Sequence, residues 1–425
     1  MKSLQKSLTK IVKSWWFPWL LAGVFLRLVF SAVTIHPDLW SLNFTSYLFS
    51  FNGVINVYDY LVNLSPSHEW SKLYGPSVFT YPPLAYFTLG GFMFIFKPLL
   101  NFSFMEWFVN HSFAGSLSNP EIFRQLLILK LPYLFFDLGI AFLLTGFFTE
   151  QRLKKIVFLL WIFNPLSFYT SFMVGQFDVI PLFFTVLALH FARNGKNELS
   201  VLSLGVGGAF KMFPLLFLPF LVLVLGKTYW QKIKLSFLGI LPYVLSILPF
   251  LSSFAFRQVS LFSAQSQKML HMILPVSGAE GIYVFVFFFL LLIFLAGYRR
   301  KNPETLYWYF LGVMLLFFSV THYHPQWFLW LTPFLVVQTV KDKFTHLWLV
   351  IALIFTWLFI TFSFEPSLNF ALFAPLNPNL VKLPGIFEEI RFYDIFQLKS
   401  IVRSIAAAAS LSLILLTWRK NEKAD

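Results

Sequence analysis

Two carboxylates stand where apolar stretches of the chain end. Asp178 lies in "GQFDVIPLFF", after an almost uncharged run that begins at Val157, and Asp38 lies in "IHPD", after the first apolar run. A carboxylate in apolar surroundings is costly unless it is neutralised or used, and a positioned one can act as a general base. Each can instead be an ordinary helix N-cap, and the residues alone leave both interpretations open.

Basic and histidine side chains stand at the ends of other apolar runs. Lys211 lies between two apolar halves in "GGAFKMFPLLFLP", and His322 and His324 flank a tyrosine in "THYHPQ". A lysine in such a place either extends to the membrane surface or holds an anion, and ionisable groups at membrane depth favour a function. Histidines at i and i+2 do not share a helix face, and the chain has no cysteine. We therefore expect no metal site.

The composition is that of a membrane protein. Of the 425 residues, 58% are hydrophobic and 12% are charged, and the mean hydropathy is +0.73, whereas soluble proteins carry about 25% charged residues. We predict an all-α, polytopic bundle of 12 to 14 transmembrane helices, because a span needs about 20 apolar residues and shorter ones must be tilted, broken or shielded. The candidate spans are 16–36, 82–99, 129–148, 156–174, 179–193, 199–212, 213–226, 235–252, 281–297, 305–321, 326–340, 346–364 and 400–418.

Short basic clusters set the expected orientation. From residue 150 onward they alternate with loops that are poor in basic clusters, and cytoplasmic loops carry the excess of Lys and Arg. Both termini are then cytoplasmic, and the acids and cations named above lie on the extracytoplasmic face. We expect the plasma membrane of a bacterium. The net charge of +14 does not indicate nucleic acid, since no basic stripe with interleaved aromatics occurs outside the spans.

One region does not fit a simple count of crossings. Spans at 16–36, 82–99 and 129–148 cannot each cross once and leave 150–155 inside. Either 82–99 is re-entrant or 100–128 contains another crossing.

The first outside loop, 37–81, is about 45 residues long, and loops of that length are usually functional or disordered. It is rich in aromatics and poor in charge, so we expect interfacial helices. It carries two further acids, Asp59 and Glu69, and ends in "TYPPLAY", which contains Tyr81. A separate acid, Asp137, lies inside a span, with Lys130 as one possible partner. A structural ion pair and a functional role stay equally open for it.

Acids and cations on one membrane face suit one specific chemistry. The acid would deprotonate an acceptor hydroxyl, the cations would hold a leaving phosphate, and an apolar groove between helices would take a lipid tail.

The ordered motifs resemble the membrane-embedded GT-C superfamily of glycosyltransferases. They are "HPD" after the first span, "VYDY" then "TYPPLAY", "NP…GQFDVIP", "FKMFPLLFLP" and "HPQWFLWLTPFL". The resemblance is nearest to the polyprenyl-phosphate-dependent mannosyltransferases, both bacterial and of the GPI mannosyltransferase I type. It covers about 35–340, which we take as the catalytic core of a single domain of 1–425, with C-terminal helices in 341–425.

The resemblance implies an inverting transfer of a hexose, mannose by preference, from polyprenyl phosphate to a hydroxyl of a lipid-linked, glycan or protein acceptor. No cofactor or metal is implied. Asp38 would be the general base, although the Asp-x-Asp pattern often seen there is missing, and Asp59 or Glu69 would be a second acid. The remaining roles are donor-phosphate binding (Lys211, His322, His324, Arg257) and the sugar or acceptor pocket (Gln176, Asp178, Tyr81).

A secondary transporter or lipid-linked glycan flippase is the main alternative, because it too would have broken helices and intramembrane charges. Such proteins are built from related halves, and no repeat is evident between 129–226 and 305–400. A purely structural membrane scaffold is a third reading, and it would not need acids and cations gathered on one side.

Overall fold

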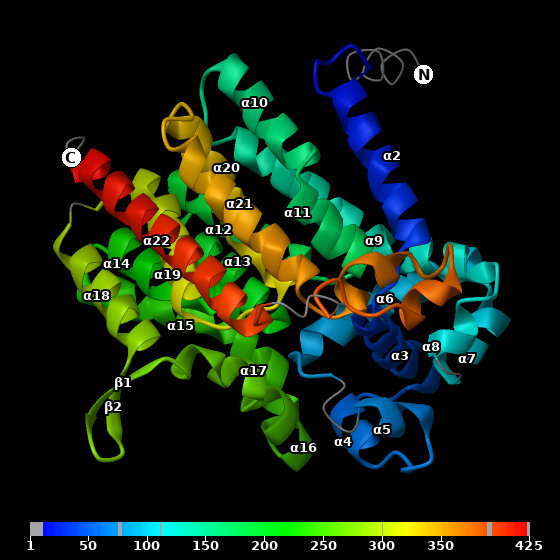
Figure 1. The fold of residues 1–425 in the computed structure, drawn as a ribbon. Coiled ribbons are helices and arrows are strands. Elements are labelled where there is room, and N and C mark those ends of the chain that lie inside the picture. Colours follow the sequence, from blue (N-terminus) through cyan, green and yellow to red (C-terminus); the bar gives the residue numbers. More distant parts are fainter. Residues whose placement is uncertain (1–11, 75–78, 111–112, 300, 389–392, 423–425) are drawn as a thin grey trace, which may run out of the picture.

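The computed structural model describes residues 12–74, 79–110, 113–299, 301–388 and 393–422 (Figure 1). These residues are predominantly helical, and the two strands among them, β1 (Ile273–Ser277) and β2 (Glu280–Tyr283), form one antiparallel hairpin. The prediction of an all-α bundle is confirmed at this level. The hairpin lies between the candidate spans 235–252 and 281–297 and takes up the first residues of the second, and both its strands are largely exposed.

Five helical segments of the described chain are long and apolar enough to cross a membrane, and a bent pair of helices brings the number to six. The five are α9 (Glu121–Thr145), Gln151–Val174, which runs from α10 (Gln151–Ile162) into η3 (Phe168–Val174), Tyr229–Phe250, which contains α15 (Tyr229–Ile247), Pro303–Val320, which contains α19 (Leu306–Val320), and Ile395–Trp418 of α22 (Ile395–Glu422). The bent pair is α2 (Phe17–Val33) and α3 (Pro37–Asn52).

Shorter apolar helices complete the bundle. They are α6 (Pro83–Ile95), α12 (Val179–Arg193), Phe213–Leu225, which ends in α14 (Leu218–Leu225), α18 (Val284–Tyr298) and α21 (Leu347–Phe362). The structure thus supports a membrane protein with several spanning helices, while 12 to 14 crossings stays a prediction. The ambiguous stretch 100–128 holds α7 (Phe102–Asn110), α8 (Phe113–Ser116) and the start of α9.

The remaining helices are short or lie between the longer ones. They are α4 (Val57–Val62), α5 (Glu69–Tyr74), α11 (Pro165–Ser167), α13 (Asn197–Phe210), α16 (Phe254–Phe256), α17 (Ala264–Gln267) and α20 (Thr332–Lys341). Two of them, α4 and α5, together with α3, occupy most of the described part of the loop predicted at 37–81, which is therefore helical as expected.

Prolines and one glycine set the helix ends that surround the site. Pro37 and Pro83 each occupy the first turn of a helix, where a missing N–H costs nothing. Gly175 has a φ of +80°, and it ends the π-helix η3 (Phe168–Val174). Helix α2 therefore stops before the proline, and α3 leaves at an angle of 85° to it.

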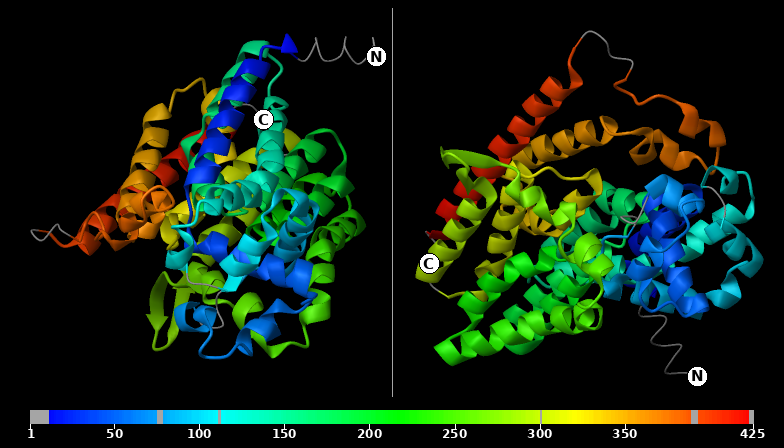
Figure 2. Two further views of the ribbon diagram at one scale, coloured as in Figure 1. Left: turned by 90° about the vertical axis from the view of Figure 1, so that its right-hand side faces the viewer. Right: turned by 90° about the horizontal axis from the view of Figure 1, so that it is seen from below.

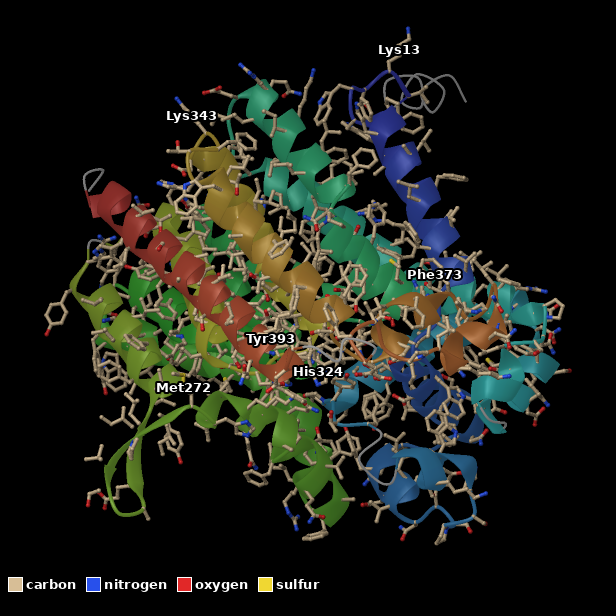
Figure 3. The ribbon with its side chains drawn as sticks, in the orientation of Figure 1. Lys13, Met272, His324, Lys343, Phe373 and Tyr393 are labelled. Atoms are coloured by element: carbon tan, nitrogen blue, oxygen red, sulfur yellow. The ribbon has the colours of Figure 1, made fainter. Side chains whose placement is uncertain are left out.

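The helices pack in groups, and some groups join helices that are distant in the sequence. Helices α12, α13 and α15 pack in series, α9 packs against α2, α10 and α12, and α22 lies against α19 and α21. Figure 2 shows the first helices of the chain gathered at one end and α21 with α22 along another side. Lys13 and Lys343 lie toward one end of the helices, whereas His324 and Met272 lie toward the other (Figure 3).

Candidate active site

Asp38 lies at the bend between α2 and α3. The backbone N–H of Asp38 donates to Nδ1 of His36 over 3.1 Å, so the histidine caps α3 and the carboxylate stays available. The side chain of Asp38 is 35% exposed, whereas that of His36 is 8% exposed. The capping role that the sequence left open for "HPD" therefore belongs to the histidine, and Asp38 occupies the first turn with its side chain partly open.

The "GQFD" segment brings a second polar group to this carboxylate. Beyond Gly175 the chain turns so that Nε2 of Gln176 donates to Oδ2 of Asp38 and, over 3.2 Å, to the hydroxyl of Tyr81. A Cβ on the glycine would lie 3.1 Å from Cδ2 of Leu39, so the close approach of the two segments favours glycine for space as well as for its positive φ. Three predicted residues that are distant in sequence thus meet here.

Asp178 is neutralised by a buried ion pair. Nζ of Lys211 lies 2.8 Å from its Oδ1, and Nε1 of Trp330 donates to the same oxygen over 2.5 Å. The side chains of Asp178 and Lys211 are 0% and 11% exposed. Asp178 stands at the N-cap position of α12 but makes no capping bond, so the capping role predicted for it is wrong. Its carboxylate is used by the lysine and the indole instead.

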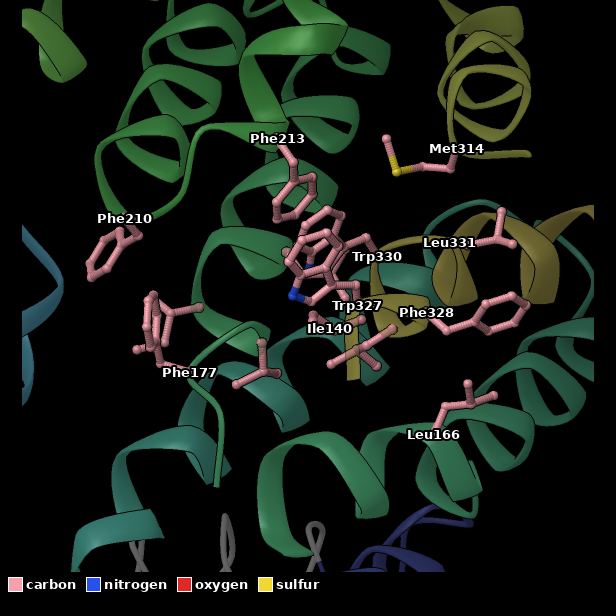
Figure 4. Close-up of a cluster of buried hydrophobic side chains, with 14 of the residues drawn as sticks. Ile140, Leu166, Phe177, Phe210, Phe213, Met314, Trp327, Phe328, Trp330 and Leu331 are labelled. Atoms are coloured by element: carbon pink, nitrogen blue, oxygen red, sulfur yellow. The ribbon is translucent and has the colours of Figure 1, made fainter. Parts of the chain in front are cut away.

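Aromatic rings surround the ammonium of Lys211. Its Nζ lies 5.1 Å from the ring centroids of Tyr81 and Trp330 and 5.8 Å from that of Trp327, distances at which a ring face attracts a cation. Figure 4 shows Trp327 and Trp330 beside Phe213 in this cluster; the two indoles stack at 5.1 Å, and Phe213 stacks on Trp330 at 4.3 Å. The ammonium of Lys211 is thus engaged by Asp178 and by these rings, and its role in binding a donor phosphate stays a prediction.

Three buried polar atoms in the segments that meet at Asp38 have no hydrogen-bond partner among the described residues. They are Oε1 of Gln176, Oδ2 of Asp178 and Nε2 of His36, each in a side chain that is at least nine-tenths buried. A buried acceptor without a hydrogen bond costs about 1–3 kcal/mol. These atoms can accept from, or donate to, the hydroxyl groups of a ligand.

A group of basic side chains lies beside His322 and His324. Arg403 approaches Nδ1 of His322 to 3.4 Å, and Nζ of Lys268 lies 5.1 Å from the ring of Trp327, which His324 contacts at 5.4 Å between ring centroids. Lys399 contacts Phe364, as both histidines do. Within the described ranges, these three cations have no carboxylate within 4.0 Å. We call Lys268, Lys399 and Arg403, together with the adjoining His322 and His324 rings, the cationic cluster.

Burial and neighbouring charge keep the two histidines neutral at pH 7. Burial, helped by Arg403 and Lys268, lowers the pKa of His322 to about 4, and burial with Lys268 lowers the pKa of His324 to about 4 against the opposing charge of Asp38. Trp327 links this group to the acid: its ring lies 5.1 Å from Nζ of Lys268 and 5.8 Å from Nζ of Lys211. Lys211 in turn lies 5.1 Å from the ring of Tyr81, whose hydroxyl accepts from the same Gln176 amide that donates to Asp38. The acid and the cationic cluster belong to one region.

The sequence analysis missed part of this cluster, because Lys399 and Arg403 lie in α22, outside the predicted core of 35–340. Their i, i+4 spacing on one helix face was the available signal. Lys268 lies between the candidate spans 235–252 and 281–297, and no motif around it in the sequence indicated a function.

The other predicted residues have different surroundings. Asp59 accepts from Nδ2 of Asn56 over 2.7 Å and from Ser253 over 2.6 Å, which ties α4 to the loop after α15. Arg257 is partly exposed and donates to the carbonyls of residues 251 and 252 in its own loop. Glu69 begins α5, but its side chain lies outside the described part of the structure. No contact of Asp59 or Arg257 joins them to Asp38.

The partner suggested for Asp137 is wrong. Its Oδ2 accepts from Nε of Arg27 over 2.7 Å, and its Oδ1 accepts from Ser167 over 2.5 Å. Both members of the ion pair are 0% exposed. Lys130 instead contacts main-chain carbonyls of two helix ends.

Among the described residues, no group of three or more His, Asp or Glu side chains could hold a metal ion. No family model matches this chain, and no curated protein is significantly similar to it. The site is therefore interpreted from its own geometry.

Proposed function

We propose that this protein is a multi-pass membrane glycosyltransferase with the inverting chemistry that its motifs suggest. It would move a hexose, mannose by preference, from a polyprenyl-phosphate carrier to an acceptor hydroxyl. The observation that supports this most is that a partly exposed carboxylate, Asp38, lies in the same region as a cluster of cations that have no carboxylate partner among the residues the structure describes. An acid that takes a proton and cations that receive an anion are the two groups this transfer needs.

In the proposed transfer, Asp38 takes the proton of the acceptor hydroxyl while the hydroxyl oxygen forms a bond to C1 of the sugar. The bond from C1 to the phosphate oxygen breaks, and its electron pair leaves with the polyprenyl phosphate. The added negative charge would be met by Lys268 and Arg403, with His324 between them and the acid. Gln176 would orient Asp38 through its hydrogen bond.

The unpartnered oxygens support a sugar pocket beside the base. Oε1 of Gln176 and Oδ2 of Asp178 can each accept from a sugar hydroxyl. The ring of Tyr81 lies against that of Phe177, which stands between these two residues in the chain. Lys211 would then act from behind the pocket by holding Asp178. On this proposal the site faces the extracytoplasmic side of a bacterial plasma membrane, and both termini lie in the cytoplasm.

The test is transfer by the purified protein in lipid vesicles from a labelled polyprenyl-phosphate hexose. Asp38→Asn should lower the rate about 100- to 10,000-fold, while Glu280→Gln, in the exposed hairpin, should leave it unchanged. Full transfer by Asp38→Asn would remove the base assignment. A wild-type protein that moves the carrier between leaflets without transferring sugar would replace the proposal with the transporter or flippase alternative.

A further inference from the structure

Lys130 is a buried lysine that contacts the ends of two helices. It lies on α9 with 0% exposure. Its Nζ donates to the carbonyl oxygens of Thr34 at 2.6 Å, Phe172 at 2.9 Å and Ser31 at 3.2 Å, with Met173 at 3.4 Å and the Thr34 hydroxyl at 3.2 Å. We propose that Lys130 is a positioning residue, whose ammonium group clamps the ends of α2 and η3 and so sets the separation of Asp38 from Gln176. In its catalytic consequence the inference rests on the proposed function.

The charge of this lysine has a physical counterpart in the helix ends. The last carbonyls of a helix have no partner within it, and each helix C-terminus carries roughly half a negative charge. Helix α2 ends at Val33 and η3 ends at Val174, so two such ends meet one ammonium. Two half-charges offset the lysine, which explains how it is buried without an ion pair among the described residues.

The two clamped ends lead directly into the site. Thr34 stands four residues before Asp38, and Met173 stands three residues before Gln176. Helix α9 adds a second contact, because the hydroxyl of Tyr133 donates to the carbonyl of Gly175 over 3.0 Å. Lys130 and Tyr133 are three residues apart and so share a face of α9. That face therefore holds the backbone on both sides of the bond between Asp38 and Gln176.

Inside a bilayer, the hydrogen bonds that Lys130 donates to the helix ends cannot be replaced by water. A carbonyl that loses its hydrogen bond there has no water to replace it. Removing the ammonium takes a donor from both helix ends, and only the Thr34 hydroxyl still donates to the carbonyls of Phe172 and Met173 among the contacts of the described residues. Those ends are expected to rearrange, and Asp38 and Gln176 would move apart. Misplacement of a reacting group by about 1 Å can lower a rate about 100-fold. We expect Lys130→Met to lower kcat by about that factor and to change KM much less.

The chain has no cysteine, so a pair of introduced cysteines can carry spin labels without background. Asn52, which ends α3, and Asn194, which follows α12, are exposed in the structure. Labels at these positions report the distance between α3, which carries Asp38, and α12, which follows Gln176. In Lys130→Met the label distance distribution should shift and broaden. Lys227→Met, at an exposed lysine just after α14, is the matched control and should leave distances and kcat unchanged.

Lys130→Arg should restore most of kcat, because the guanidinium keeps the charge and offers several donors. Either an unchanged distance distribution or an unchanged kcat in Lys130→Met overturns the proposal. If that variant does not fold, Tyr133→Phe decides: it removes only the bond to the Gly175 carbonyl, and a kcat equal to that of the wild type overturns the clamp. If the wild-type protein transfers no sugar, the proposed function fails, whereas the label distances still test the clamp itself.

Discussion

The buried pair of Lys211 and Asp178 allows a sharp test of how this site is held together. In Lys211→Met the carboxylate of Asp178 stays buried at 0% exposure, with the indole of Trp330 as its remaining donor. Removing one partner of a buried ion pair costs about 3–5 kcal/mol, because the other charge is left uncompensated. We expect the free energy of unfolding to fall by that amount.

The double variant Lys211→Met with Asp178→Asn separates the charge effect from packing. It removes both charges, so it should be more stable than the sum of the two single variants predicts, by up to about 3 kcal/mol. The assay is reversible unfolding in mixed detergent micelles, followed by tryptophan fluorescence.

The chain contains a matched exposed pair as a control. Nζ of Lys234 lies 2.6 Å from Oε1 of Glu198, but these side chains are 58% and 57% exposed. Lys234→Met should change the free energy of unfolding by no more than about 1 kcal/mol. The reasoning is refuted if Lys211→Met costs no more than this control, or if the effects at Lys211 and Asp178 are simply additive.

Three further predictions follow from single features of the site. The pKa of His324 is about 4 in the folded protein, below its ordinary value of about 6.5, so the unfolded state binds more protons between these two pH values. The free energy of unfolding should therefore fall as the pH drops from about 6.5 to 4. His324→Gln should make this fall smaller in unfolding curves measured at several pH values. Gly175→Ala should cost more in free energy of unfolding than Gly195→Ala, because both glycines have positive φ but only at Gly175 would a Cβ meet neighbours within 4 Å; equal costs would contradict the packing argument. Arg403→Gln should raise KM for a polyprenyl-phosphate donor about tenfold, the loss expected for one charge-assisted hydrogen bond. Arg257→Gln is the control and should leave KM unchanged, because the hydrogen bonds described for this arginine stay within its own loop.

Much of the architecture follows from local chemistry. Apolar stretches indicated helices, and the prolines at 37 and 83 marked helix starts, because the proline ring suits the first turn and breaks a helix interior. The helical character of the first outside loop was also predictable from its composition. The hairpin at 273–283 was not, since its short strands are exposed and carry no alternating pattern.

The individual contacts of the site were beyond local reasoning. Lys130 and Asp137 lie on one helix, seven residues apart, so their backbones are about 10.5 Å apart along the axis and an ion pair between them is unfavourable. The partner of Asp137 is Arg27, 110 positions away. Only the packing of α2 against α9 decides this.

By itself, the sequence determined that this chain is an apolar, helical, cysteine-free protein with acids and cations at the ends of its apolar runs. Composition and helix-breaking residues are local properties, and they act wherever the chain goes. The tertiary structure decided that Asp38 meets Gln176, that Asp178 is neutralised by Lys211, and that α22 supplies Arg403 to the cationic cluster. These pairings depend on which helix ends lie together, and that is set by packing between segments up to 138 residues apart.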